Sequence, residues 1–471
     1  MAPGRELNVD PTSWIFPIQV LLGTVRHGEV EACSISKVPD KLRKPNKDAY
    51  VPQVVSIGPY HKGSQNDLFM MEQPKWNYML SLLGRSLFQA EQEGKIKDGP
   101  STVKECGETI LEIEYIVRAS YGGNALSEPH ELAKLMLLDG FFLLEFIHRL
   151  HEYKESLKAG ENGEYDDDPV FESLDKVLSV LSDLLLLENQ VPFIVLKKLY
   201  RKLFPVPVPV EQDHRVATLA MEALGYFSVV PTSGAAHLLH LVYLSIVNQE
   251  DRKKTRRAHK ELKRCATRLR ARGVTIRQGG RSNMNQFGEI FNFEINFDKG
   301  VLEIPQFRIK KSTEVTWRNM IAWEQSRIIT SCKLTSYALF FQGLICCTHD
   351  IELLERLGII VNESGKRNVD LLKMFQTLSE GVDQMDWSYS DVCGKLNSDT
   401  GTISLTKWPI VTWHQCRRII AIIVYYCKNW YSILIKEHIP TVWKLIGVLA
   451  AVALLGLTIA QTYYSAKSSN N

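Results

Sequence analysis

Residues 129–153 read PHELAKLMLLDGFFLLEFIHRLHEY, a run that predicts one long helix. Apolar side chains cover nearly every face of a helix with this sequence: Leu132, Leu135, Met136, Leu137, Leu138, Phe141, Phe142, Leu143, Leu144, Phe146 and Ile147. A helix that is apolar all round lies at the centre of a core. The sequence therefore predicts a helical body built around this segment.

Apolar residues at helical spacing predict further helices on both sides of the central one. The predicted ranges are 71–91, 110–119, two helices within 170–204 that are split at Pro192, 216–224, 235–247, 255–270, 315–329, 335–347, 351–357, 369–378 and 411–434. Residues 205–209 read PVPVP and predict an extended segment.

The pattern changes at residues 290–304, where alternating apolar residues predict a β-hairpin. Ile290, Phe291, Phe293, Ile295 and Phe297 alternate with polar positions, a turn follows at 298–300, and apolar residues resume over 301–304. The predicted fold class is an α-rich α+β fold. It consists of one large, mainly helical domain with a small antiparallel hairpin or sheet, plus one C-terminal transmembrane helix.

Composition narrows the classes of function. The chain has 471 residues, 45% of them hydrophobic, which is enough for a sizeable core. Its 56 basic and 53 acidic residues nearly cancel, so a protein built around nucleic acid is disfavoured. Nine cysteines without a CxxC pair indicate neither a disulfide framework nor a zinc site. We therefore expect free thiols, no metal and no cofactor.

The transmembrane helix is predicted near the C-terminus, where residues 445–460 read LIGVLAAVALLGLTIA. Such an uncharged run, extended to Tyr464, is long enough to cross a membrane. The predicted anchor residues are Trp443, Lys444, Leu445, Ala460, Tyr463 and Tyr464. The domains are then a flexible segment 1–30, a globular domain 31–440 and an anchor with its tail 441–471.

Topology follows from the position of the anchor. Residues 1–10 lack the pattern of a secretory signal, so a single-pass protein with its body in the cytosol is expected. The sequence does not distinguish the plasma membrane from an endomembrane. A second apolar stretch at 419–435 is interrupted by Lys428 and Asn429, and a buried or interfacial helix is favoured there over a second span.

A basic stretch at residues 252–281 holds thirteen Lys or Arg residues and one acid, Glu261. Three interpretations compete: the solvated face of a helix, a surface that lies against an anionic membrane leaflet, and a nucleic-acid site. Nucleic acid is the least favoured of the three, because aromatic residues are not interleaved. The candidate patch residues are Arg252, Lys253, Lys254, Arg256, Arg257, Lys260, Lys263 and Arg264.

Four acids interrupt apolar runs: Asp139, Glu145, Glu188 and Glu324. They could form an enzyme's acidic site, or they could cap helices and satisfy buried backbone groups, which is the favoured interpretation. The chain has no Gly-rich phosphate loop, GxSxG or HExxH motif, and no histidine lies at triad spacing from these acids. We therefore predict that the protein is not an enzyme.

Several blocks of the sequence resemble one plant family. Residues 50–63 read YVPQVVSIGPYHKG, and Met71-Glu72 precedes Lys75 and Trp76. Further blocks are LDGFFLLE at 138–145, ENQVPF at 188–193, GVLEIP at 300–305, NMIAWEQ at 319–325 and QTY at 461–463. From about residue 35 to 465 the chain is similar to the plant family called domain of unknown function 247, also catalogued as uncharacterised protein family 0481.

The resemblance implies a plant membrane protein without established enzymatic activity. Some grass members of the family are associated with self-incompatibility, which suggests recognition or signalling. Lys62 stands where the family's first block has a second histidine, and this departure disfavours a metal site on paired histidines there.

The leading hypothesis is a membrane-tethered interaction protein that binds a protein or peptide partner. The polar segments 154–169 and 278–287 are its candidate contact loops. The alternatives are an enzyme with a site around the four acids and a nucleic-acid or nuclear protein that uses the basic stretch.

Overall fold

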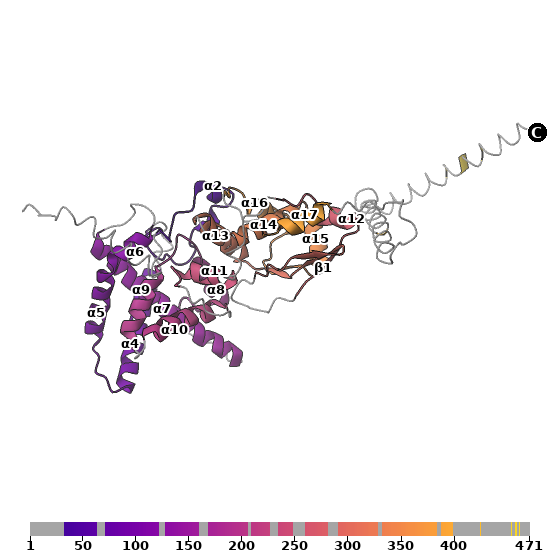
Figure 1. Ribbon diagram of the computed structural model, residues 1–471. Helices are drawn as coiled ribbons and strands as arrows, with labels where there is room; N and C mark the ends of the chain where they lie inside the picture. Colours follow the sequence, from indigo (N-terminus) through magenta and orange to yellow (C-terminus); the bar gives the residue numbers. More distant parts are fainter. Residues whose placement is uncertain are drawn as a thin grey trace, which may run out of the picture.

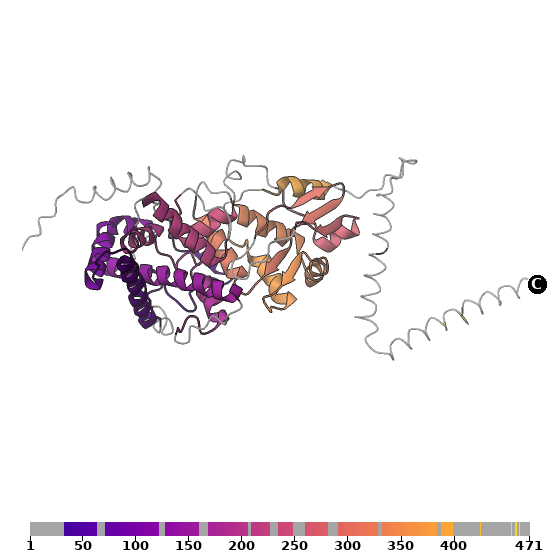
Figure 2. The same ribbon diagram turned by 90° about the horizontal axis from the view of Figure 1, so that it is seen from below.

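The computed structural model describes most of the body of the chain, which forms two halves in contact (Figure 1; Figure 2). The described residues are 33–63, 71–121, 128–159, 168–205, 209–226, 234–247, 260–280, 291–327, 332–383 and 388–398, with the single positions 424, 454, 457, 458 and 461. A helical half ends at residue 247, and a smaller half of helices and short strands begins at residue 260. One cluster of buried apolar residues extends through both halves.

The helical half is built around α7 (Pro129–Ala159), which confirms the predicted central helix and extends it by six residues. Four helices pack on it: α4 (Glu72–Gln92), α5 (Gly99–Glu112), α9 (Phe193–Leu203) and α10 (Pro209–Leu224). The half is completed by α6 (Glu114–Ser120), α8 (Leu174–Asp183) and α11 (Leu238–Ile246). Phe141, Phe142 and Phe146 of α7 are fully buried, as expected of a helix with apolar residues on every face.

In its described residues, the second half combines six helices with two small sheets. The helices are α12 (Ala266–Ala271), α13 (Thr313–Gln325), α14 (Lys333–Leu344), α15 (Thr348–Arg356), α16 (Asn368–Thr377) and α17 (Ser390–Ser398). Aromatic rings fill its core, with centroids 5.3 Å apart for Phe307 and Trp317 and 4.9 Å apart for Tyr337 and Phe341. Such edge-to-face pairs add to the stabilisation that burial provides.

A hairpin forms where it was predicted, but its first strand is shorter than predicted, with only Phe297 of the alternating apolar residues in it, and the hairpin is part of a mixed sheet. Strand β2 (Asn296–Asp298) pairs antiparallel with β3 (Val301–Ile304), with Phe297 opposite Leu302. Lys299 and Gly300 have positive φ angles of 47° and 79°, as a two-residue hairpin turn requires. Strand β1 (Thr275–Gln278) pairs in parallel with the other edge of β3. A second, two-stranded sheet pairs β4 (Phe307–Ile309) in parallel with β5 (Ile360–Asn362).

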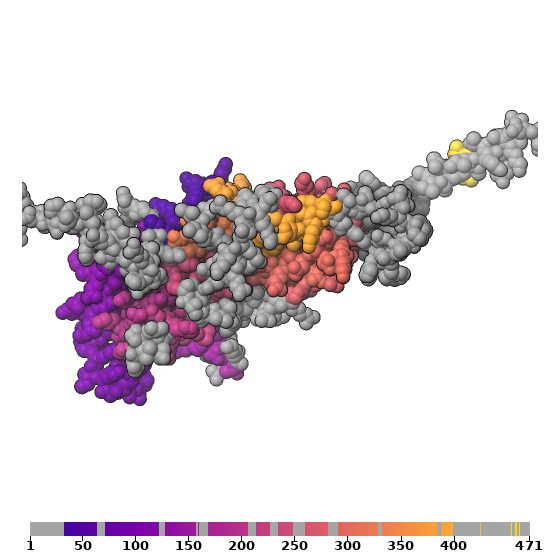
Figure 3. Space-filling model, in the orientation of Figure 1, coloured from indigo at the N-terminus to yellow at the C-terminus, as the bar shows by residue number. Residues whose placement is uncertain are grey.

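Residues 33–63 contain α2 (Asp40–Arg43) and a 3₁₀ turn, η1 (Asp48–Tyr50), and bind both halves. The amide of Val38 donates to Glu188 in the helical half at 2.6 Å. Asn46 donates to Glu314 in α13 at 2.8 Å. Figure 3 shows the indigo N-terminal segment lying against the orange C-terminal half. This early segment therefore ties together parts of the chain that are far apart in sequence.

The structure corrects the predicted membrane anchor, and with it the expected fold class and localisation. Among the residues that the structure describes, no helix is both long and apolar enough to cross a membrane. A span needs about 20 consecutive apolar residues, whereas between Trp443 and Tyr464 only Leu454, Leu457, Thr458 and Gln461 are described. The prediction of a single-pass membrane helix is therefore wrong for the described chain. The anchor residues Trp443, Lys444, Leu445, Ala460, Tyr463 and Tyr464 lie outside it.

Several other predictions differ from the structure in their bounds or lie outside the described residues. The helix predicted over 110–119 is the junction of α5 and α6, and the helix predicted over 255–270 begins only at Ala266 within the described residues. The predicted loop 154–169 starts inside α7. Residues 1–30 lie outside the described ranges, as do all but one of residues 411–435.

Candidate binding cleft

The four acids that the sequence singled out are buried, and each has its own set of partners. Asp139 lies in α7 and accepts hydrogen bonds from the Gly58 amide and the Lys75 ammonium, both at 2.8 Å. Lys75 also donates to the Ser56 carbonyl at 2.7 Å and to Glu72 at 3.0 Å. Burial alone would lower the pKa of Lys75, but Asp139 and Glu72 more than offset it, so Lys75 is charged.

Glu145, six residues further along α7, belongs to a network with two arginines. Arg85 of α4 and Arg149 of α7 donate their Nε–H groups to it at 2.9 and 2.8 Å. Arg149 continues to Asp168 at 2.6 Å, and Asp168 also accepts the hydroxyl of Tyr78. Both arginines are held by fixed partners, so Glu145 orders α4 against α7.

Glu188 and Glu324 hold segments of backbone. Glu188 accepts the Val38 amide at 2.6 Å and the Arg43 guanidinium at 2.5 Å. Glu324 accepts the amides of Leu334 and Thr335 at 2.9 and 2.8 Å. Burial raises the pKa of Glu324 to about 7, although these hydrogen bonds act against the shift.

The acids do not form one site. In the described part of the chain no two of the four acids share a hydrogen-bonding partner, and each carboxylate joins two or more segments. The arrangement matches the predicted structural role of satisfying buried polar groups.

Part of the basic stretch can be placed. Lys260, Lys263 and Arg264 precede α12 in a segment that is not helical. Arg264 donates to the carbonyls of Leu396 and Asn397 in α17, at 3.2 and 3.0 Å. It therefore has a structural role, whereas Lys260 and Lys263 are exposed. Arg252, Lys253, Lys254, Arg256 and Arg257 lie outside the described residues.

A cleft of about 940 Å³ lies between α8 and the segment from β4 to the start of α13, and the sequence did not predict it. The side that α8 forms contains Asp175, Leu178, Ser179, Ser182 and Asp183. The opposite side contains Arg308, Lys310, Lys311, Ser312 and Val315. The rest of the lining comes from Asp48, Val51, Gln53, Leu186 and Glu363.

The two walls carry opposite charge. Asp175 of α8 pairs with Lys311 at 3.0 Å. Both side chains are exposed, Asp175 to 75% and Lys311 to 72%. Such an exposed pair contributes less than about 1 kcal/mol, so a ligand could displace it. Arg308 pairs with Glu363, while Lys310 adds a further cation to the same wall.

Asp183, at the end of α8, holds a neighbouring segment of the cleft lining in place. Its carboxylate accepts the amides of Gln53, Val54 and Val55 at 2.9, 2.7 and 2.9 Å. Burial raises the pKa of Asp183 to about 6, against the effect of the three amides. The carboxylate therefore fixes the extended segment that follows η1 along the cleft.

One group of described residues could hold a metal ion: Cys265, Cys346 and Asp350. Sequence reasoning missed it because the two cysteines are 81 residues apart and no CxxC pair marks them. The sequence did contain a local pattern that indicates part of this group. Cys346-Cys347 followed three residues later by Asp350 places thiols and a carboxylate on one helix N-terminus.

Comparison with known proteins identifies the family of the chain but not an activity. The chain is 29% identical over 388 residues to a UPF0481 protein of Arabidopsis thaliana, covering 76% of this chain and 75% of that protein. It is 20% identical over 553 aligned positions to a putative UPF0481 protein of the same plant, covering 96% and 94%. No solved structure matches the chain. The model of the DUF247 family, described as a plant protein of unknown function, matches residues 35–457, and the chain therefore belongs to this family.

Proposed function

We propose that the protein is a binding protein, and that the cleft between α8 and β4–α13 takes a peptide segment of a partner protein. The observation that supports this is the cleft itself, whose two walls differ in charge and also carry apolar and hydroxyl groups. Its volume of about 940 Å³ lies near the upper end of the range of roughly 300–1,000 Å³ for ligand pockets.

The lining suits a peptide. A peptide presents an N–H donor and a C=O acceptor at nearly every residue, and serine hydroxyls can pair with either. Ser182 and Ser312 supply hydroxyls, and that of Ser179, which donates to the Asp175 carbonyl at 2.8 Å, can accept from a peptide amide. Leu178 and Val315 offer apolar contact to an anchoring side chain. A ligand would place an acidic residue near Lys310 and Lys311 and a basic one near Asp175.

The proposal is tested with the full chain and a random peptide library displayed on phage. We expect enriched peptides with an apolar residue flanked by one acidic and one basic residue. The substitution Ser182→Trp, which fills the cleft, should weaken their binding at least about tenfold, or by ~1.4 kcal/mol. Affinity would be measured by fluorescence anisotropy with labelled peptides.

A matched substitution controls for added bulk. Ser101 is exposed near the start of α5, outside the cleft lining, so Ser101→Trp should leave affinity unchanged. Equal binding by the wild type and Ser182→Trp, or a library that gives no enrichment, would rule out this cleft as the binding site.

A further inference from the structure

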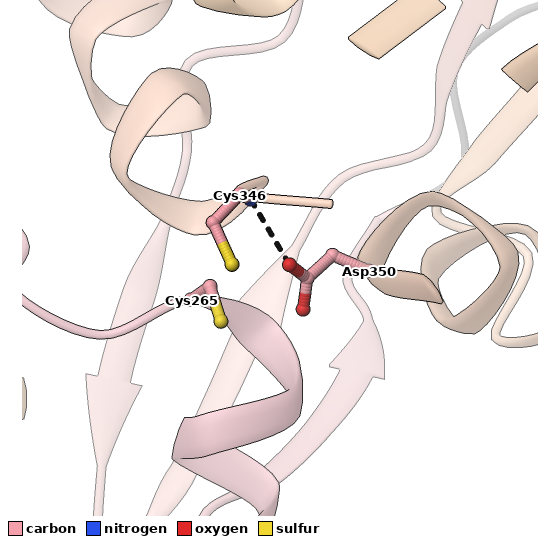
Figure 4. Close-up of side chains that lie close together, drawn as sticks. All are labelled: Cys265, Cys346 and Asp350. Carbon is pink, nitrogen blue, oxygen red and sulfur yellow. Dashed lines mark hydrogen bonds between the residues drawn. The ribbon is translucent and has the colours of Figure 1, made fainter. Parts of the chain in front are cut away.

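We propose that Cys265, Cys346 and Asp350 form a site for a zinc ion; we call these three residues the thiol cluster. The two sulfur atoms and a carboxylate oxygen all lie within 4.8 Å of one another. Figure 4 shows the two sulfurs and the carboxylate grouped around a common space. The site is distinct from the cleft and does not depend on the function proposed for it.

The spacing of these atoms suits tetrahedral zinc after a small adjustment. With Zn–S bonds of about 2.3 Å, sulfur ligands of a tetrahedral site lie roughly 3.8 Å apart. Atoms that start within 4.8 Å must therefore close by no more than about 1 Å. Cys265 and Asp350 are buried and fixed, whereas Cys346 is exposed and can make this movement.

The fold brings the two cysteines together through a close backbone approach. Cys265 precedes α12, and Cys346 follows α14. A side chain at Gly343 would lie 2.9 Å from both Cβ and the carbonyl oxygen of Leu262, so only glycine lets these segments pack. Arg264 fixes the same segment from its other side through the carbonyls at the end of α17.

Hydrogen bonds orient the carboxylate. Asp350 accepts the amide of Thr267 at 2.8 Å on one oxygen, and the amides of Cys346 and Cys347 at 3.0 and 3.2 Å on the other. Partners of this kind around a ligand fix its geometry and raise metal affinity. The oxygen that accepts the two cysteine amides also accepts the Cys347 thiol at 3.5 Å, so its lone pairs are used. The amide of Thr267 uses one lone pair of the other oxygen, and the second lone pair there is the one a metal would bind.

Charge and ligand type favour zinc over the common hard cations. Two thiolates and a carboxylate around Zn²⁺ carry a net charge of −1, which the N-terminus of α15 stabilises through its dipole. Thiolate ligands select zinc over magnesium or calcium, which prefer oxygen ligands. Since the three side chains supply only three ligands, a water molecule or the ligand of a partner would complete the tetrahedron on the exposed side of Cys346.

The test is a Co²⁺ titration of the full chain, reduced and kept free of oxygen. Cobalt bound by thiolates absorbs in the near ultraviolet, and zinc should abolish this absorption by displacing it. We expect one Co²⁺ per chain, and the release of two thiol protons when zinc binds, measured with a pH indicator in weakly buffered solution. Because it removes a ligand itself, Cys346→Ser should weaken binding by more than the roughly 10- to 100-fold that loss of an outer-shell partner costs.

Two further variants, one at the other cysteine ligand and one at a cysteine outside the cluster, complete the titration. Cys346 is exposed, so its serine variant should fold, while Cys265→Ser tests the buried ligand. Cys393→Ser changes a buried cysteine of α17 that lies outside the cluster and should bind cobalt normally. No thiolate absorption in the wild type, or absorption that Cys346→Ser retains, would overturn the proposal. So would a reduced chain that binds no cobalt but forms a Cys265–Cys346 disulfide in air.

Discussion

Glu324 is a carboxylic acid whose partners are all uncharged among the described residues. It accepts the amides of Leu334 and Thr335, the Thr335 hydroxyl at 2.6 Å and the Tyr243 hydroxyl at 3.2 Å. These donors favour the carboxylate, but complete burial favours the neutral acid and prevails, raising the pKa to about 7. The residue therefore titrates near neutral pH inside the core.

The raised pKa of Glu324 predicts that stability falls as pH rises. Between the ordinary pKa of 4.5 and about 7, the folded state holds the proton and the unfolded state does not. The stabilisation is therefore fully present below about pH 4.5 and is lost as pH rises through about 7, a change of about 3 kcal/mol. Urea unfolding from pH 4.5 to 8 would measure it.

The Glu324→Gln variant isolates this contribution, because glutamine does not titrate. We expect it to be less stable at acid pH, since its NH₂ group faces other donors, and to lack this part of the pH dependence. The exposed Glu294→Gln serves as control and should follow the wild type. If Glu324→Gln and the wild type change in parallel over the whole pH range, Glu324 does not titrate near 7.

Polar residues within apolar runs were recognisable in the sequence, but their partners were not. That Asp139, Glu188 and Glu324 satisfy buried backbone groups was the favoured interpretation, and their hydrogen bonds match it. The partners are distant in sequence: Asp139 binds the amide of Gly58, 81 positions away. The carbonyl of Gln190 would lie 2.5 Å from a side chain at Gly58. Three blocks that carry the family resemblance thus meet at one buried glycine.

At the scale of elements, α7 and α9 cross at Gly140. A Cβ atom there would lie 2.4 Å from Cδ1 of Leu199 and 3.3 Å from Cγ1 of Val195. Both of these side chains are fully buried, so neither can move into solvent. The absence of a side chain at Gly140 is therefore what allows the two helices to pack this closely.

We predict opposite effects for two alanine substitutions within helices. Gly140→Ala should destabilise the protein by about 1–3 kcal/mol, because it overpacks the crossing. Gly107→Ala in α5 adds a Cβ that meets only Leu137, at 4.0 Å, so helix propensity should stabilise the protein by about 0.5–1 kcal/mol. Urea unfolding measures both. A Gly140→Ala variant as stable as the wild type would show that Leu199 can repack.

Helices were predictable because their signal is local, and most strands were not. The hairpin of β2 and β3 has adjacent strands and a recognisable turn, and it was predicted. Strands β1, β4 and β5 have four, three and three residues, too few to show a period, and β4 finds its partner more than 50 positions later. The cleft depends on this placement of β4 against α8, so the sequence could not predict it either.

At the scale of the whole molecule, α13 joins the two halves. Nearly all of its residues are buried, including Trp317 and Trp323. Tyr243 of α11 reaches it through Glu324, and His237 and His240 pack on Trp323 with ring centroids 4.8 and 4.6 Å apart. The two halves therefore share an interface whose centre is one helix.

Asn319 of α13 links segments that are far apart in sequence. Its side chain accepts the amide of Leu187 at 2.9 Å and donates to the carbonyls of Ala49 and Val315, both at 2.8 Å. It thus holds the loop before α9 and the N-terminal segment on one helix. Because Asn319 is completely buried, its removal leaves polar groups that water cannot reach.

We therefore predict that Asn319→Ala uncouples the halves as well as destabilising the protein, by on the order of 3 kcal/mol. Hydrogen exchange at increasing urea concentrations, measured by mass spectrometry, would follow the protection of a peptide from α9 in the helical half and of one from α14 in the second half. In the wild type both should lose protection at one urea concentration, and in the variant at two. Asn292→Ala, which removes only a local bond to the amide of Glu294, is the control. A common shift of both peptides in Asn319→Ala would mean that Asn319 stabilises the core without coupling its halves.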